Sequence, residues 1–178
     1  VRILMEAGAR STDTTPGGQT PLHQAVIKGR LDILKVLLEY RNVLDIDAQD
    51  NEKDTALAAA VRCNELECAG ALIRAGANIN QESDKGWTAF LYAVALERPP
   101  KFIDLLLAQS GSHIHRVTEG WGAAIHLACQ HLQLDTVNKL ISCGADVNQQ
   151  ITGPNSTPLI SICSPRPSGT RNRQENLK

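Results

Sequence analysis

The sequence predicts an all-α solenoid, built from stacked helix-turn-helix units from which β-hairpin loops project. Three observations lead to this prediction. A short motif recurs along the chain at a nearly constant interval. The residues between copies of the motif follow the apolar spacing of a helix face. Aromatic residues make up only 3% of the chain, so the core must use aliphatic side chains, which suit closely packed helices.

The recurring motif is Thr-Pro-Leu-His and its variants. Successive copies begin at Thr20, Thr55, Thr88, Ala123 and Thr157. The interval between copies is roughly 34 residues, which lies in the range of repeat architectures. Gly-Ala pairs at 8–9, 76–77 and 144–145 give the same period independently, because each pair follows the previous one by two repeat lengths. Such a period is typical of a supersecondary unit that buries its apolar face only by stacking on its neighbours.

The motif predicts where the first helix of each unit begins. Thr20 can cap a helix, because its hydroxyl can accept a hydrogen bond from an N–H of the first turn. Pro21 fits the first helical position, where the missing N–H has no cost. Leu22 and Ala25 then face inward, and Gly29 permits the turn into a second helix.

The second helix of each unit is predicted from apolar residues on one helix face. This spacing occurs at Leu31, Leu34, Leu37 and Leu38, at Leu66, Ala69, Leu72 and Ile73, and at Leu134, Val137, Leu140 and Ile141. The helix ends near a glycine such as Gly76, which suits a left-handed C-cap. The segment that follows, for example 78–86, is polar around a single apolar residue.

Three departures from the pattern are expected to alter the local structure. Lys53 stands in the second unit where other hairpins have glycine. Trp121 takes the same position in the fourth unit, so we expect a distorted hairpin tip there. Pro99 and Pro100 lie between the two helices of the third unit, where proline is compatible with a helix start but stiffens the turn.

These residues resemble the ankyrin repeat family, whose signature T-P-L-H-x-A is matched in full by residues 20–25. The resemblance covers residues 1–163, as about four full repeats with a partial repeat at each end. Residues 164–178 are predicted to be a flexible polar tail. Because both terminal repeats are partial, we expect the chain to be part of a longer repeat protein.

Composition and charge argue against several classes of function. The formal net charge is −1 and no basic stripe occurs, so nucleic-acid binding has little support. No apolar run approaches the length needed to insert into a membrane. We find no phosphate loop, dinucleotide turn or nucleophile–base motif, so the sequence predicts neither an enzyme nor a bound cofactor.

Histidine and cysteine residues are the candidate ligands and catalysts. His23 and His126 occupy the histidine position of the family motif, where the resemblance implies a structural hydrogen bond near the capping residue. His126, Cys129 and His131 are close in sequence, but no fourth ligand is evident, so we predict no metal site. The five cysteines form no paired motif, which favours buried, reduced thiols.

The resemblance implies a concave binding face formed by the hairpin tips and the first helices. Trp87 and Trp121 are candidate hot spots, although each could instead pack on a neighbouring hairpin. The residues carried over to this face are Gln19, Ile27, Lys28, Asp54, Arg62, Asp84, Lys85, Trp87, Tyr92, Leu96, Glu119, Trp121, Gln130 and His131. Asn80 and Asn148 resemble the asparagines that are hydroxylated in ankyrin repeats, or else they stabilise the hairpins.

The sequence therefore predicts a non-enzymatic scaffold that binds a protein or peptide partner. The mixed charge of the predicted face suits such a partner better than DNA. Two alternatives remain open. The chain could be a substrate-recognition or targeting module of a larger enzyme or ubiquitin-ligase adaptor, or it could be an inhibitory or regulatory subunit. The expected location is the cytoplasm, the nucleus or both.

Overall fold

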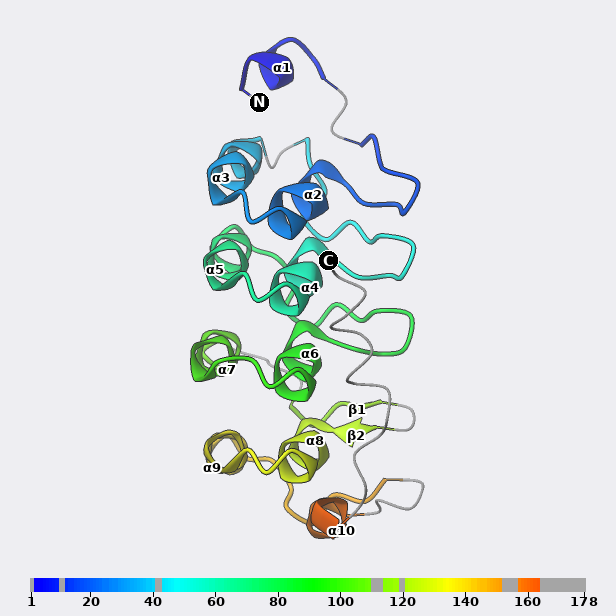
Figure 1. The fold of residues 1–178 in the computed structure, drawn as a ribbon, viewed down its shortest axis with the longest axis vertical. Coiled ribbons are helices and arrows are strands. Elements are labelled where there is room, and N and C mark those ends of the chain that lie inside the picture. Colours follow the sequence, from blue (N-terminus) through cyan, green and yellow to red (C-terminus); the bar gives the residue numbers. More distant parts are fainter. Residues whose placement is uncertain are drawn as a thin grey trace. The chain divides into compact units, whose positions relative to one another are not determined.

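A computed structural model describes residues 2–9, 12–40, 43–109, 114–118, 121–151 and 157–163. The chain forms two compact units, unit 1 from Val1 to Ala89 and unit 2 from Phe90 to Lys178. Within each unit, helices are arranged in two columns and loops project beside one of them (Figure 1). The predicted tail at 164–178 lies outside the described residues.

Unit 1 contains two complete helical pairs in its described part. Its helices are α1 (Arg2–Glu6), α2 (Pro21–Ile27), α3 (Leu31–Glu39), α4 (Ala56–Arg62) and α5 (Leu66–Arg74). The helix α2 pairs with α3, and α4 pairs with α5. The pairs also stack, because α2 packs on α4 and α3 packs on α5. We call α2, α4 and their counterparts the inner helices, since the hairpin loops project beside them, and α3, α5 and their counterparts the outer helices (Figure 1).

Unit 2 repeats this arrangement. It contains α6 (Ala89–Ala95, of which Ala89 belongs to unit 1), α7 (Pro100–Leu107), α8 (Ala124–Gln130), α9 (Leu134–Ser142) and α10 (Pro158–Cys163). The inner helix α8 packs on its outer partner α9 and on the next inner helix, α10. The outer helices α7 and α9 are also in contact. The predicted all-α repeat architecture is confirmed in both units.

The inner helices begin where the sequence predicts. Thr20 precedes α2 with an extended backbone, and Pro21 is the first helical residue. Before α4, the hydroxyl of Thr55 accepts a hydrogen bond from the N–H of Ala58 at 3.3 Å. The outer helix α7 also begins at a proline, Pro100, directly after Pro99. Capping and the fixed φ of proline are local effects, so they define these boundaries without help from tertiary contacts.

The turn from inner to outer helix has a left-handed residue in each complete repeat that the structure describes. Gly29 has φ +62°, and the equivalent residues Asn64, Glu97 and Leu132 have φ +64°, +51° and +55°. A side chain other than glycine is disfavoured in this region by roughly 1–2 kcal/mol, less for asparagine. The turn geometry is therefore imposed by helix packing at Glu97 and Leu132, where the local sequence opposes it.

The hairpin tips also have a left-handed residue at an equivalent position, with one exception that the sequence predicts. Gly18, Lys53 and Gly86 are equivalent and have φ of +75°, +61° and +71°. In the fourth repeat the left-handed residue is Gly122, at φ +79°, one position after Trp121. This shift accompanies the paired strands β1 (Val117–Thr118) and β2 (Gly122–Ala123). The left-handed residue is thus displaced from the Trp121 position, while residues 119–120 of this tip lie outside the described residues.

Small side chains allow the inner helices to approach closely. In α4, Ala56, Ala58 and Ala60 are at most 3% exposed. Larger aliphatic side chains fill the space between inner and outer helices, and Leu34 and Leu72 are completely buried. The core thus uses alanine where helices stack and leucine where they pair, as the scarcity of aromatic residues indicates.

Candidate partner-binding surface

His23 connects two consecutive repeats of unit 1. The ring is 1% exposed and lies on the first turn of α2. Its Nδ1 atom lies 2.9 Å from the hydroxyl oxygen of Thr20 and accepts the backbone N–H of Thr20 at 3.3 Å. Its Nε2 atom lies 3.0 Å from the carbonyl oxygen of Asp54, in the next hairpin. These contacts suit a neutral ring protonated on Nε2, and they confirm the structural role predicted for His23.

His126 makes the equivalent contacts in unit 2 without a capping threonine. The backbone N–H of Ala123 donates to its Nδ1 atom at 3.4 Å. Its Nε2 atom lies 3.0 Å from the carbonyl oxygen of Gln149, in the following hairpin. Burial lowers the pKa of His126 below its ordinary value of 6.5, while the hydrogen bond to Gln149 opposes this shift.

The lowered pKa of His126 predicts that unit 2 loses stability in mild acid. The folded state favours the neutral ring, so below pH 6.5 the unfolded chain binds more protons than the folded chain. The stabilisation is therefore complete above pH 6.5 and is lost as the pH falls from 6.5 towards the folded pKa. We expect the urea midpoint of unit 2 to be lower at mildly acidic pH than at neutral pH. The midpoint would be obtained from the hydrogen exchange of amides in unit 2 at increasing urea concentrations.

Two variants test the assignment to His126. His126→Gln should reduce the difference in urea midpoint between neutral and acidic pH, because the titrating group is gone. His115→Gln removes an exposed histidine of the same unit and should leave the difference unchanged. An unchanged pH dependence in His126→Gln would assign the effect to other groups.

An ion pair joins two residues that the sequence assigns to the binding face. The side chain of Asp54 is 1% exposed and pairs with Arg62, on the last turn of α4. Arg62 also pairs with the exposed carboxylate of Glu52 at 3.2 Å. The backbone of Asp54 is held as well, because its N–H donates to Asp50 Oδ1 at 3.0 Å. Asp54 therefore fixes the second hairpin against α4 and is not accessible to a partner.

Neighbouring hairpin loops of unit 1 are tied together by hydrogen bonds. The N–H of Asn51 donates to the carbonyl of Gly17 at 3.0 Å, and its side-chain amide donates to the carbonyl of Pro16 at 3.0 Å. The second and third loops are joined in the same way, because the N–H of Asp84 donates to the carbonyl of Glu52 at 3.3 Å. The loops thus form a connected row whose backbone is ordered before any partner arrives.

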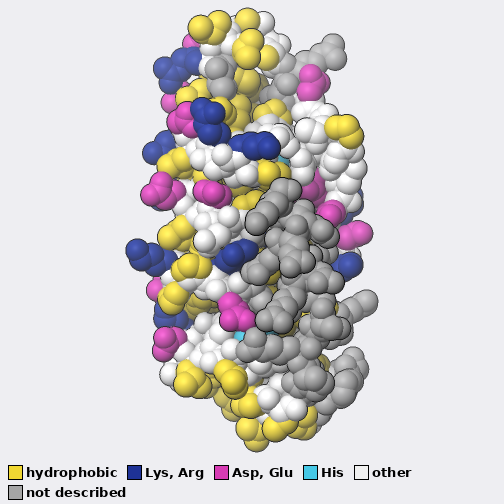
Figure 2. All heavy atoms as spheres, viewed as in Figure 1, with side chains coloured by type: hydrophobic (Ala, Val, Ile, Leu, Met, Phe, Trp, Pro, Cys, Tyr) yellow, Lys and Arg dark blue, Asp and Glu magenta, His cyan; other side chains and the backbone are white. Residues whose placement is uncertain are grey.

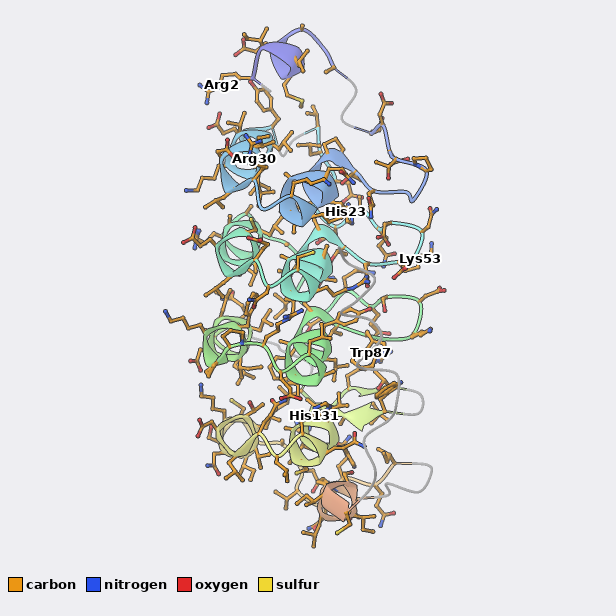
Figure 3. All side chains as sticks on the ribbon, in the orientation of Figure 1. Arg2, His23, Arg30, Lys53, Trp87 and His131 are labelled. Atoms are coloured by element: carbon orange, nitrogen blue, oxygen red, sulfur yellow. The ribbon has the colours of Figure 1, made fainter. Side chains whose placement is uncertain are left out.

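Exposed polar and charged side chains lie along this row. We define the hairpin rim of unit 1 as Asn51, Glu52, Lys53, Asp84 and Lys85, all of which are exposed. Figure 3 shows Lys53 on the projecting loops, beside the column of inner helices. The rim carries both signs of charge on a rigid backbone, which suits recognition of a folded or peptide surface of mixed charge.

The structure divides the predicted binding residues into accessible and buried sets. Exposed or half-buried are Gln19, Ile27, Lys28, Arg62, Asp84, Lys85, Leu96 and Trp121. Buried, and therefore corrected, are Asp54 at 1%, Trp87, Tyr92 and His131 at 6% each, and Gln130 at 7%. Glu119 lies outside the described residues. The resemblance implies which loops and helices carry the predicted contact residues, but it does not give the depth of each side chain.

His131 is the clearest case of a predicted contact residue that faces inward. It follows α8, and its Nδ1 atom lies 2.9 Å from Oε1 of Glu97. The side chain of His131 is 2% exposed, while that of Glu97 is 52% exposed. The carboxylate therefore reaches from the left-handed turn after α6 over the buried ring. His131 supports the inner-helix end of unit 2, and Glu97 is the accessible member of the pair.

Sequence reasoning did not assign the three residues Asn51, Glu52 and Lys53 to the binding face. Lys53 enters the sequence prediction only as a replacement for glycine. A lysine at φ +61° is strained, and strain of this kind is often found at functional positions. The signal available in the sequence was the presence of a long charged side chain where neighbouring hairpins have glycine.

Asn80 and Asn148 follow the turns at the start of their hairpin segments. The N–H of Asn80 donates to Asn78 Oδ1 at 3.0 Å, and the N–H of Asn148 donates to Asp146 Oδ1 at 2.9 Å. Asn148 is exposed and Asn80 is half-buried. The side chains that close these turns thus belong to Asn78 and Asp146, two positions earlier. Hydroxylation of Asn80 and Asn148 stays a prediction.

The thiols differ from one another in environment. Cys68 is buried, and this burial raises its pKa to about 11, while burial also raises the pKa of Cys129. Both are therefore weak nucleophiles at neutral pH. Cys143 and Cys163 are exposed, so the expectation of buried thiols is wrong for these two.

Within the residues that the structure describes, no three histidine, cysteine or acidic side chains converge in a way that could hold a metal ion. None of the described helices has the length and apolar character needed to span a bilayer.

Paired inner and outer helices, with tied hairpin loops beside the inner ones, define a helical repeat protein. The chain belongs to the ankyrin repeat family, because the family model for ankyrin repeats, described as three copies, matches residues 1–83, 42–118 and 76–151. Ankyrin repeats are in general non-catalytic modules that mediate contacts between proteins, and a partner-binding role is supported for this chain.

The chain is also similar to known proteins that contain ankyrin repeats or match it in sequence. The chain is 29% identical over 164 residues to the nuclear factor NF-kappa-B p105 subunit of Gallus gallus, covering 91% of this chain and 16% of that protein. An ankyrin repeat domain from Acinetobacter baumannii AYE matches with a TM-score of 0.72 and 30% identity, over 80% of this chain and 70% of the other.

A second solved structure covers almost the whole chain. It is a chain from the complex of a predatory endopeptidase of Bdellovibrio bacteriovorus with an immunity protein, with a TM-score of 0.79 and 26% identity. The match covers 99% of this chain and 90% of that one. By contrast, the chain spans less than a quarter of the length of the curated relatives that it matches.

Proposed function

We propose that the chain is a non-enzymatic recognition scaffold that binds a protein or peptide partner through the hairpin rim and the adjoining ends of the inner helices. In unit 1 the contact residues are those of the rim together with Gln19, Ile27 and Lys28. In unit 2 they are Leu96, Trp121 and Glu97. This set replaces the buried members of the sequence-based prediction by accessible neighbours on the same loops and turns.

The observation that supports this proposal most directly is the row of hydrogen-bonded hairpins in unit 1. Its backbone bonds, Asn51 to Gly17 and Asp84 to Glu52, fix the positions of exposed charged side chains. Because the surface is already ordered, binding would cost little conformational entropy. Affinity then depends on a few side chains at the centre of the contact.

One alternative is also favoured by a specific observation. The chain spans only 16% of the p105 relative, so a repeat domain of this size is a small part of that protein. By analogy, the chain would act as the targeting module of a larger protein, with its activity located elsewhere. The contact surface would be the same in both cases, and only the consequence of binding would differ.

Charge reversal on the rim tests where a partner binds. Lys53→Glu with Lys85→Glu reverses both lysines of the rim and should weaken binding of an identified partner at least tenfold, about 1.4 kcal/mol. The partner would first be identified by photo-crosslinking from position 53. Its dissociation constant would then be measured with purified components by isothermal titration calorimetry.

The matched control reverses two exposed cations on the outer helices of the same unit, Lys35→Glu with Arg74→Glu. The control should change the dissociation constant less than twofold, because those residues lie on the outer helices, whereas the hairpin loops project beside the inner ones. If the control weakens binding and the rim variant does not, the partner binds the outer helices and the proposed surface is wrong.

A further inference from the structure

Glu52 of the hairpin rim is accessible, yet both its backbone and its side chain are held in place. Its N–H donates to Asp50 Oδ1 at 2.9 Å, and its carbonyl accepts the N–H of Asp84 at 3.3 Å. Its Oε2 atom accepts a hydrogen bond from Nη1 of Arg62 at 3.2 Å, although the side chain is 62% exposed. A fixed and accessible carboxylate loses little freedom when a partner binds, so Glu52 is suited to be a contact group.

The charges at Arg62 are not balanced. Its guanidinium carries one positive charge and pairs with two carboxylates, those of Asp54 and Glu52. One negative charge is therefore in excess within this group of three side chains. The side chain of Asp54 is 1% exposed, so the excess charge is presented to solvent, and to a partner, at Glu52.

The lysines of the rim do not neutralise this excess charge. Among the side chains that the structure describes, neither Lys53 nor Lys85 forms an ion pair with Glu52. The exposed carboxylate of Asp84 belongs to the adjoining loop, whose backbone is bonded to that of Glu52. A cation that contacts Glu52 is therefore attracted by Asp84 as well, and the two lysines remain available for acidic groups of the same partner.

Long-range attraction does not select a basic or an acidic partner for this chain. The formal net charge is only −1. Figure 2 shows Lys and Arg side chains interspersed with Asp and Glu side chains over the described part of the visible face. Without a strong field of one sign, the preference for a charged group depends on individual side chains that are held in place, such as Glu52.

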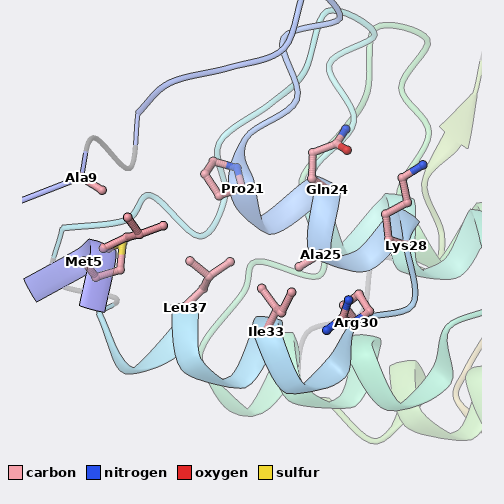
Figure 4. A pocket seen from close by; sticks show the side chains of 10 residues that line it. Met5, Ala9, Pro21, Gln24, Ala25, Lys28, Arg30, Ile33 and Leu37 are labelled. Atoms are coloured by element: carbon pink, nitrogen blue, oxygen red, sulfur yellow. The ribbon is translucent and has the colours of Figure 1, made fainter. Parts of the chain in front are cut away.

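The cavity in unit 1 is a different kind of surface. It has a volume of about 410 Å³ between α1, α2 and α3, and apolar side chains such as Met5 and Ile33 form most of its lining (Figure 4). The charged residues of this lining, Lys28 and Arg30, are both cations. The lining therefore offers no opposite charge to a basic group, whereas Glu52 does.

We propose that Glu52 selects a lysine or arginine side chain on the partner, and that Arg62 and Asp54 are positioning residues for this contact. The inference rests on the proposed function, because it names the chemistry that the hairpin rim recognises. Arg62 fixes the carboxylate of Glu52, and Asp54 offsets the charge of Arg62, so Glu52 remains attractive to a cation. Loss of the buried charge at Asp54 would leave Arg62 and Glu52 to neutralise each other.

Random peptides displayed on phage are the probe for this preference. They are selected on the full chain, and a peptide is retained only if it shifts the amide NMR signals of the hairpin rim. The retained peptides should share a lysine or arginine, and a set without one would overturn the inference. One of them is then synthesised in two forms, with the shared basic residue or with glutamine in its place. The ratio of their dissociation constants, measured by isothermal titration calorimetry, gives the preference for the cation.

The wild type should prefer the basic peptide by about tenfold, because both charges lose water in the contact. Glu52→Gln should abolish the preference, since glutamine keeps the size of the side chain and loses its charge. Asp54→Asn should also lower it, although Asp54 is too buried to touch the peptide. The matched control Glu67→Gln removes an exposed carboxylate from the outer helix α5 and should leave the preference unchanged. A loss of stability alone weakens both peptides alike, so it does not alter the ratio.

The possible failures are distinguishable. A ratio that Glu52→Gln leaves unchanged would overturn the inference, while the rim would still be the binding surface. Tighter binding of the peptides to Glu52→Gln would also overturn it, because an acidic peptide group would then compete with Glu52 for Arg62. A ratio that Asp54→Asn leaves unchanged would show that Asp54 and Arg62 are not positioning residues. If no displayed peptide shifts the amide signals of the rim, the proposed function itself is wrong, and the inference falls with it.

Discussion

Trp87→Ala is expected to lower the free energy of unfolding by about 3–5 kcal/mol, the usual cost of removing a buried tryptophan. The side chain of Trp87 is 6% exposed, although it directly follows the left-handed residue of a hairpin tip, Gly86. Its carbonyl accepts the N–H of Ser83 at 2.9 Å, which closes the loop. The loss should appear as a lower urea midpoint by circular dichroism and as faster hydrogen exchange at Ser83.

Trp121→Ala is the matched comparison, because Trp121 occupies the next hairpin in the sequence and is only half-buried. We expect a smaller destabilisation from this variant, since less apolar surface returns to water. If Trp87→Ala left the urea midpoint unchanged and abolished partner binding, Trp87 would be a contact residue after all. Trp87→Phe should recover most of the lost stability, because the aromatic ring is largely retained.

The sequence left open whether Trp87 contacts a partner or packs on a neighbouring hairpin, and its burial favours packing. The repeat pattern places a residue at a hairpin tip, but it does not state how far the tip folds back over its helices. In the second hairpin, the ion pair of Asp54 with Arg62 draws the loop onto α4. Such contacts depend on side chains outside the motif, and so the repeat pattern could not predict them.

Helix starts were predictable because their causes are local. Thr20 and Pro21 favour a helix start in any context, and α2 begins at Pro21 with Thr20 as its capping residue. The turn at Glu97 was not predictable as left-handed, because glutamate disfavours φ +51° and adopts it only under the constraint of packed helices. The fold thus follows from the repeated pattern, while the binding surface depends on the residues that depart from it.

His23→Ala is expected to lower the free energy of unfolding by about 2–3 kcal/mol, from a lost buried ring and a buried N–H left without its acceptor. The N–H of Thr20 would lose its bond to His23 Nδ1, now 3.3 Å long. The carbonyl of Asp54 would keep one donor, the N–H of Asp50 at 2.9 Å. The effect should therefore be largest at the start of α2 and weaker in the next hairpin.

The second repeat shows why the loss should not be larger. Ala58 stands at the histidine position and is buried, and the hydroxyl of Thr55 accepts its N–H at 3.3 Å. In the His23→Ala variant, the hydroxyl of Thr20 can still accept the N–H of residue 23, so the cap of α2 is retained, as it is at Thr55. The cap is local, so the contact between repeats through Asp54 is not restored.

His126→Ala provides the comparison in unit 2. His126 has no threonine hydroxyl beside it, because Ala123 is the capping residue. Its removal should therefore cost about 1 kcal/mol less than removal of His23, the difference being one hydrogen bond. Hydrogen exchange separates the causes, since the amide of Thr20 should lose protection in His23→Ala and keep it in His126→Ala. An equal loss in both variants, with Thr20 still protected, would mean that ring burial alone stabilises these repeats and that the hydrogen bonds between them contribute little.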